Sequence, residues 1–204
     1  METATRQPGR PRSEAARSAV LAAAGDLLRE GGLSAVTVEA VSARSGVGKP
    51  TIYRSWPNRT AVAIDAFAAD MAAQVTLADS GDARRDLIER VRQVAAFYAT
   101  PAGAVLVQLL AATTTDPLAG ERLREQFLAG RRAETTAMWQ RAVTRGEVRS
   151  ELSPDVAIDV LFSPIVYRLL VGHAPIDPAA ATELAEAALD GLLAPSRPGK
   201  RNAR

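Results

Sequence analysis

The sequence contains no cysteine and only one histidine, His173, among its 204 residues. Without cysteine the chain has no disulfide, thiolate zinc site, iron–sulfur cluster or cysteine nucleophile, which fits a reducing cytoplasm. A single histidine also excludes most imidazole catalysis and every metal site built from several histidines. We therefore expect no metal centre and no cofactor. His173 follows an apolar stretch that should form a helix. A helix C-terminus stabilises a protonated histidine, and contact with a ligand is the alternative role.

Long apolar runs are also missing. No uncharged apolar stretch approaches the ~18–20 residues of a membrane-spanning helix, and the charged segment Met1 to Arg12 lacks the apolar run of a signal peptide. Hydrophobic residues make up 47% of the chain, charged residues 24% and aromatic residues only 4%. This composition is typical of a folded soluble protein. We expect a cytoplasmic protein of one or two domains that does not associate with a membrane.

The formal net charge of +2 hides an uneven distribution. Residues 1–60 hold nine basic and five acidic side chains, whereas residues 61–195 hold twelve basic and eighteen acidic ones. Residues 196–204 hold four basic side chains and no acidic one. A basic front on an acidic body indicates an anionic partner at one end of the molecule. A solvated surface with two basic termini explains the same counts.

Helical patterns run along the whole chain, and no segment alternates apolar and polar residues for long enough to indicate a strand. Alanine, the strongest helix former, supplies 41 residues. Gly31-Gly32 should end the first helix, and Pro164 should kink the eighth. The patterns predict an all-α fold of about nine helices, at about residues 13–30, 38–45, 49–55, 59–75, 83–98, 102–112, 117–145, 154–172 and 179–193.

Two short helices around the turn 46–48 are the most informative feature. Such short helices are marginal alone, but packed on a third helix they form a helix-turn-helix unit. Val47 and Ile52 have the pattern of residues that pin the second short helix inward. The remaining side chains combine donors, cations and an apolar surface, as a recognition helix in a major groove requires. A helical hairpin in an ordinary bundle is the alternative. The exposed set is Lys49, Pro50, Thr51, Tyr53 and Arg54.

The stretch TVEAVSARSGVGKPTIYRSWPNR, from Thr37 to Arg59, resembles the signature of the tetracycline-repressor (TetR) family of bacterial transcription regulators. The shared features are a threonine opening the second helix, a tight glycine turn, a Thr-Ile-Tyr core in the third helix, and an aromatic and a basic residue entering the fourth. The resemblance covers about residues 13–70, a third of the chain. Ser45 and Trp56 depart from it, because alanine and phenylalanine are commoner at these positions.

The resemblance implies roles in DNA binding for individual residues. Ile52 and Trp56 should be structural, whereas Arg44 is either a phosphate contact or a solvated charge. Contacts to phosphates or sugars are implied for Thr37, Tyr53 and Arg59, the first at a helix N-terminus that favours an anion. Contacts to bases are implied for Lys49, Pro50, Thr51 and Arg54.

Two glycine-containing segments suggest further contacts. The segment Pro8-Gly9-Arg10-Pro11-Arg12 is similar to the Gly-Arg-Pro core of arms that enter the minor groove, which makes Arg10 and Arg12 candidate DNA contacts. A flexible basic tail is the alternative. The segment 46–49 is not a phosphate-binding loop, because Ala43 replaces the first glycine of that motif and no strand precedes it.

In the resembled family the later helices enclose a small-molecule cavity, and the last two pair with those of a second subunit. The resemblance therefore implies an unknown small hydrophobic effector and a C₂ homodimer. Candidate ligand contacts, each also a candidate for the core, are Phe97, Leu109, Phe127, Trp139, Phe162 and Tyr167. Candidate dimer contacts are Ile165, Leu169, Leu184, Ala188, Gly191 and Leu192.

These features predict four regions along the chain: a flexible basic arm (1–12), a three-helix helix-turn-helix domain (13–59), a larger ligand-binding and dimerisation domain (60–194, with 60–75 as connecting helix) and a disordered basic tail (195–204). We expect a homodimeric repressor that binds double-stranded DNA at a palindromic operator and is released by its effector. One alternative is a helical small-molecule-binding protein or enzyme with a purely structural hairpin, although no convergent acid–base pair supports catalysis. Another is an architectural DNA-binding protein without a ligand.

Overall fold

The computed structural model describes residues 10–76 and 79–191, with the backbone alone for residues 10–12. All regular structure in these ranges is helical. Three consecutive segments, α7 (Pro117–Arg122), η1 (Leu123–Leu128) and α8 (Ala129–Thr144), follow one another without a break. Counted as one, they bring the described residues to nine continuous helices, so the predicted all-α class and helix number are confirmed.

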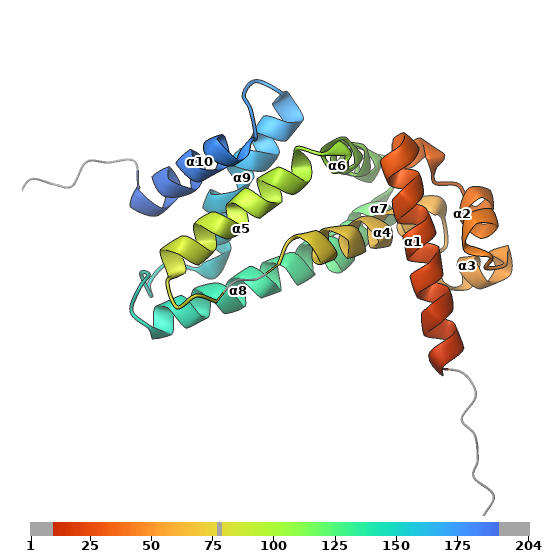
Figure 1. The fold of residues 1–204 in the computed structure, drawn as a ribbon, viewed down its shortest axis with the longest axis horizontal. Coiled ribbons are helices and arrows are strands. Elements are labelled where there is room, and N and C mark those ends of the chain that lie inside the picture. The colour runs from red at the N-terminus through yellow and green to blue at the C-terminus, as the bar shows by residue number, and fades with distance from the viewer. Residues whose placement is uncertain (1–9, 77–78, 192–204) are drawn as a thin grey trace, which may run out of the picture.

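Helices α1 (Arg10–Ala35), α2 (Val38–Ser45) and α3 (Lys49–Ser55) pack together at one end of the molecule (Figure 1). Helix α1 begins three residues before the predicted Ser13, so residues 10–12 belong to a helix and not to an extended arm. Gly31 and Gly32 leave helical geometry, as predicted, but one more turn follows before the helix ends.

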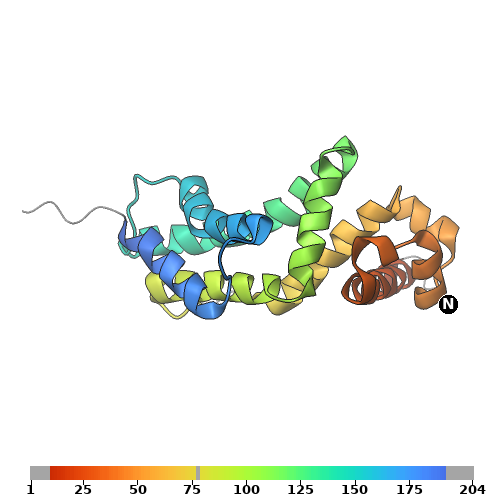
Figure 2. The ribbon, with the colours of Figure 1, turned by 90° about the horizontal axis from the view of Figure 1, so that it is seen from above.

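Helix α4 (Arg59–Gln74) leads from this unit into the rest of the molecule (Figures 1 and 2). Its N-terminus is capped by Asn58, whose side-chain oxygen accepts a hydrogen bond of 2.8 Å from the Ala61 N–H. Apolar residues on opposite sides of α4, such as Val62 and Phe67, are both buried. One helix therefore packs against the N-terminal unit and against the body.

The body consists of α5 (Ala83–Tyr98), α6 (Pro101–Thr113), the α7–η1–α8 helix, α9 (Pro154–Val171) and α10 (Pro178–Asp190). Most of its helices begin with a side-chain cap followed by proline at the first position, where the missing N–H costs nothing. Pro164 lies inside α9 without ending it. The π-helical segment η1 was not predicted, because its extra residue per turn depends on packing and not on a local motif.

A continuous apolar core joins the two ends of the molecule. Ile52 and Trp56 are buried in the N-terminal unit, as predicted, and belong to the same core cluster as the body residues. At its centre the Phe67 ring lies 5.5 Å from that of Phe97 and 5.2 Å from that of Phe127, between ring centroids. These tilted and edge-on contacts are favourable arrangements for aromatic pairs.

Within the described ranges, no single helix has the length and apolar character needed to cross a membrane. Helices α5 and α6, which meet at 84°, pass such a test only as a bent pair.

Candidate nucleic-acid interface and interior cleft

The turn between α2 and α3 is held by its own backbone and side chains. Gly46 ends α2 with φ of 71°, a left-handed conformation that favours glycine, and its N–H donates to the Ser42 carbonyl at 3.0 Å. The Ser42 hydroxyl donates to the Val47 carbonyl at 2.8 Å. The turn therefore sets the angle between the two short helices.

The turn and the core orient α3 so that one side is buried and the other faces solvent. Ile52 and Trp56 point inward, and Tyr53 keeps 51% of its surface exposed. Thr51 is half-buried at the edge of the exposed side. The predicted recognition residues Lys49, Pro50 and Arg54 are exposed. The structure thus brings the predicted base-contacting side chains and Tyr53 together on one accessible surface, the α3 face (Lys49, Pro50, Thr51, Tyr53 and Arg54).

Two cations near the α3 face are held by carboxylates, which the sequence did not reveal. Lys49 Nζ lies 2.7 Å from Glu39 Oε1. Arg44 donates to both oxygens of Glu30, at 2.8 and 2.9 Å. Arg44 is exposed and paired with Glu30, so a phosphate contact by this side chain would compete with that pair. The Lys49 ammonium holds the pKa of Glu39 below its usual value, mainly through this hydrogen bond.

The predicted backbone-contacting residues Thr37 and Arg59 both lie at helix N-termini. Thr37 caps α2, since its Oγ1 accepts a 3.0 Å hydrogen bond from the Ala40 N–H. Arg59 is the exposed first residue of α4. Arg10 and Arg12 lie in the first turn of α1, and their side chains are outside the described part of the structure. An extended arm that includes these two arginines is therefore contradicted.

Asp65 of α4 connects the N-terminal unit to the body. The carboxylate is almost fully buried and accepts hydrogen bonds from three side chains. Arg17 of α1 donates at 3.0 Å and Trp56 Nε1 at 2.8 Å. Arg122 of α7 donates through two nitrogens, at 2.9 and 2.8 Å. Because each donor lies on a different element, this one carboxylate fixes α1, the end of α3 and α7 relative to α4.

A second polar contact joins the same two parts. The side-chain oxygen of Gln108, on α6, accepts a 2.7 Å hydrogen bond from the Leu33 N–H. This N–H directly follows the break at Gly31 and Gly32, where the helix no longer supplies an acceptor of its own. The end of α1 is therefore tied to the body.

The body contains a cleft of about 400 Å³ between η1, α8 and α9, which we call the α8–α9 cleft. Its floor comes from α4 and α5, and its lining is mostly apolar. The π-helical turn of η1 places Phe127 and Leu128 on its wall. Such turns occur frequently at functional sites.

The aromatic residues proposed to contact a ligand fall into two groups. Phe127, Phe162 and Tyr167 line the α8–α9 cleft together. Phe97 and Leu109 are packed into the core away from it, and Trp139 borders a separate hollow near the end of α10. For Phe97 and Leu109 the structure favours the core, the alternative that the sequence left open, because helical periodicity identifies an inner face but not which part of it remains unfilled.

The cleft also contains polar residues that sequence reasoning missed. Arg90 and Tyr98 come from α5 and Arg131 from α8. Arg90 and Tyr98 interrupt the apolar stripe of α5, which also includes Leu87 and Val94. A charged residue in an apolar stripe was the available signal, since such residues are rarely buried without a role.

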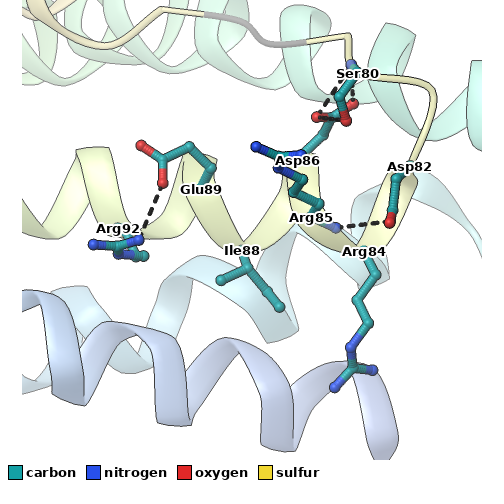
Figure 3. Close-up of a pocket in the computed structure, with 8 residues that line it drawn as sticks. All are labelled: Ser80, Asp82, Arg84, Arg85, Asp86, Ile88, Glu89 and Arg92. Atoms are coloured by element: carbon teal, nitrogen blue, oxygen red, sulfur yellow. Dashed lines mark hydrogen bonds and ion pairs between the residues drawn. The ribbon is translucent and has the colours of Figure 1, made fainter.

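A surface hollow of about 610 Å³ lies along the outer side of α5 (Figure 3). Its polar groups bond with one another: the Ser80 hydroxyl donates to Asp86 at 2.6 Å, and Arg92 pairs with Glu89 at 3.4 Å. Figure 3 shows these pairs along the helix, with the Arg84 side chain directed toward the neighbouring helix. Among the described residues, no buried side-chain polar atom that lacks a hydrogen-bond partner lines this hollow, so it offers no built ligand site.

The predicted dimer residues are only partly available to another subunit. Ile165 is completely buried within the chain, so its proposed dimer contact is wrong. The half-buried residues Leu169, Leu184 and Ala188 pack against the chain's own core. Gly191 is exposed just after α10, and Leu192 lies outside the described residues. The exposed apolar side chains of α9 are instead Val156, Val160, Tyr167, Leu170 and Val171.

Across the ranges 10–76 and 79–191, no group of three or more acidic or histidine side chains is arranged to hold a metal ion.

Comparison with known proteins gives consistent matches over nearly the whole chain. The family model described as "Bacterial regulatory proteins, tetR family" matches residues 20–66, and "Tetracyclin repressor-like, C-terminal domain" matches residues 77–188. The HTH-type transcriptional regulator YdeS of Bacillus subtilis is 34% identical, over 92% of this chain and 95% of that protein. The DNA-binding transcriptional repressor TetR of Mycobacteroides abscessus is 28% identical, over 93% and 98% of the two chains.

Among solved structures, that of the TetR family transcription regulator SCO0332 superimposes with a TM-score of 0.83 at 33% identity. The match covers 88% of this chain and 99% of that one.

Proposed function

The chain belongs to the TetR family of bacterial transcription regulators, and from that premise we propose that it is a homodimeric repressor released from a palindromic operator by a small apolar effector. In this proposal residues 13–59 bind the DNA, and residues 60–75 connect them to the later helices. Those later helices bind the effector and form the dimer interface. The two family-model matches, to residues 20–66 and 77–188, support a division of the chain at α4.

The observation that carries the proposal is the exposure of the α3 face. Tyr53 and Arg54 extend from a helix whose other side is fixed by Ile52 and Trp56. In the major groove, Lys49 and Arg54 would meet base edges, and Pro50 and Thr51 would meet thymine methyl groups or base edges. Tyr53, Arg59 and the helix N-terminus at Thr37 would bind the phosphate backbone and set the register.

A two-fold operator needs two copies of α3 in successive major grooves, about 34–36 Å apart. The exposed apolar side of α9 supports α9 as the main pairing surface, with Val156, Val160 and Tyr167 contacting the second copy beside α10. Apolar side chains along one helix side, at positions 156, 160 and 167, are what a self-complementary C₂ interface requires.

The effector would act through the contacts that join the body to the reading unit. A molecule in the α8–α9 cleft touches η1, which is continuous with α7 and hence with Arg122 and its partner Asp65. A shift of α7 would be passed to α1 and α3 through Asp65. Release requires that the effector bind the shifted conformation more tightly than the DNA-bound one.

The direct test is binding to a recovered operator. Genomic fragments bound by the protein give a short duplex, which is then titrated with the wild type and with the double variant Tyr53→Ala, Arg54→Ala. Losing a base contact costs about 1–3 kcal/mol and relaxes specificity. Arg149→Ala, an exposed arginine far from α3, is the matched control. Equal affinity of the double variant and the wild type would contradict the assignment.

The proposal places the protein in the bacterial cytoplasm with its DNA, as a binding protein and not an enzyme. Turnover of a bound ligand, or weak and salt-insensitive binding to duplex DNA, would favour the alternative of a helical ligand-binding protein with a structural hairpin.

A further inference from the structure

The α8–α9 cleft contains a buried hydroxyl group without a strong hydrogen-bond acceptor. Tyr98 is buried at the cleft floor, and its Oη lies 3.9 Å from the Met71 sulfur, the partner it has in the structure. A thioether is a weak acceptor. Because buried donors are nearly always satisfied, a donor that faces a cleft with so weak a partner indicates that a ligand oxygen belongs there.

The same end of the cleft carries an excess of positive charge. Arg90, only 2% exposed, donates to Glu134 at 2.7 Å and to the Val75 carbonyl at 3.0 Å. Arg131 donates to the other oxygen of Glu134 at 3.0 Å. Two guanidinium groups therefore share one carboxylate. Arg131 and Tyr98 both line the cleft.

The outer rim lacks this excess of positive charge. Arg132 there pairs with both Asp155 and Asp159, at 2.8 and 2.6 Å. Of the charged residues that line the cleft, Arg132 and Asp159 form one pair at the rim, whereas Arg90 and Arg131 are both cations. Between them the wall is apolar, formed by residues such as Val94, Phe127 and Phe162. The charge gradient favours a ligand that enters with its negative end inward.

We propose that the effector is an apolar monoanion whose carboxylate binds Tyr98 Oη and the Arg131 guanidinium, with its hydrocarbon body along Phe127 and Phe162. The inference rests on the proposed function, in which this cleft is the effector site. Burial raises the pKa of Tyr98 above its usual range, which keeps the hydroxyl protonated as a donor. Hydrogen bonds to an ionised acceptor in a dry site are about twice as strong as neutral ones.

The test uses two sets of probes in which only the polar group changes. The bicyclic set is 2-naphthoate, 2-naphthamide and 2-naphthylmethylammonium, and the linear set is octanoate, octanamide and octylammonium. Calorimetric titration of the full chain gives each dissociation constant. We expect the carboxylate of at least one set to bind about 10-fold more tightly than its amide, as expected for a charge-assisted hydrogen bond, and the ammonium compound to bind more weakly still.

Two variants locate the carboxylate. Tyr98→Phe should weaken binding of the carboxylate about 10-fold without changing the shape of the cleft. Arg131→Gln should bring the carboxylate and the amide to nearly equal affinity. Arg124→Gln, an exposed position on η1 outside the cleft lining, should change neither value. Thermal unfolding of each variant shows whether the fold is retained.

The proposal is overturned if in neither set the carboxylate binds more tightly than its amide and ammonium analogues, if no probe binds at millimolar concentration, or if both variants bind the carboxylate like the wild type. Operator binding, measured separately with the same preparations, distinguishes this result from failure of the proposed function. A chain that binds its operator but prefers neutral probes is a repressor with a different effector class.

Discussion

Arg122 of α7 holds Asp65 of α4 through two parallel hydrogen bonds of 2.9 and 2.8 Å, across 57 positions of sequence. This planar pairing is the strongest arrangement between a guanidinium and a carboxylate. Because Asp65 is buried and also binds Trp56 and Arg17, the pair joins the body directly to the helices that carry the α3 face.

Replacing Arg122 by leucine should lower the free energy of unfolding by about 2–4 kcal/mol, because the buried Asp65 charge loses two charge-assisted hydrogen bonds. Urea unfolding followed by circular dichroism measures the change. Arg124→Leu removes an exposed arginine two residues away and should cost less than about 0.5 kcal/mol. Similar values for both variants would show that the Asp65 pair does not contribute to the fold.

Replacing Arg59 by alanine should weaken binding to specific and unrelated duplexes by similar factors. The reason is that a phosphate contact carries no sequence information. The slope of log affinity against log salt concentration should fall by about one. Titrations at several salt concentrations test this, and a loss confined to the specific duplex would instead make Arg59 a base contact.

Replacing Glu39 by glutamine should tighten DNA binding by about 3–5-fold at low salt, since it removes a negative charge near the phosphates and releases Lys49. The gain should shrink as salt is added. Glu151→Gln makes the same charge change at an exposed position in the loop before α9 and should leave affinity unchanged. Weaker DNA binding by Glu39→Gln would instead mean that the ion pair with Glu39 orients Lys49 for its contact with DNA.

Burial raises the pKa of Tyr98 in the folded chain, so the folded state keeps this proton above pH 10 whereas the unfolded state loses it. This group's contribution to stability is therefore complete below about pH 10 and falls as pH rises further. The free energy of unfolding of Tyr98→Phe, measured between pH 8 and pH 11, should decline less steeply than that of the wild type. Parallel curves would show that Tyr98 does not titrate differently in the two states.

Replacing Val160 by aspartate should raise the dimer dissociation constant by about 100-fold or more, because a C₂ interface would bury the new charge twice. The side chain is 49% exposed in the single chain, so the subunit fold should be retained. Sedimentation velocity over a range of concentrations measures the change. An unchanged dimer would place the interface away from this side of α9.

Much of the fold follows from local signals in the sequence. The sequence predicted where most helices begin and end from the threonine at 37, the glycine turn at 46 and the apolar periodicity. These signals are reliable because capping and turn geometry depend on neighbouring residues. The inward position of Ile52 and the exposure of Arg54 followed from the same periodicity. Predictions failed where the outcome depends on distant partners. Ile165, for example, is buried by residues of its own chain and not by a second subunit.

The helical class, the helix-turn-helix unit and the solvent-facing residues of α3 could be derived from the amino-acid order, since these depend on contacts within one or two turns. Only the tertiary structure decided that Arg122 and Trp56 meet at Asp65, that Arg44 and Lys49 have carboxylate partners, and that Tyr98 and Arg131 share one cleft. Those relationships join segments that are far apart in the chain, and neither composition nor periodicity states which of many similar side chains packing will bring together.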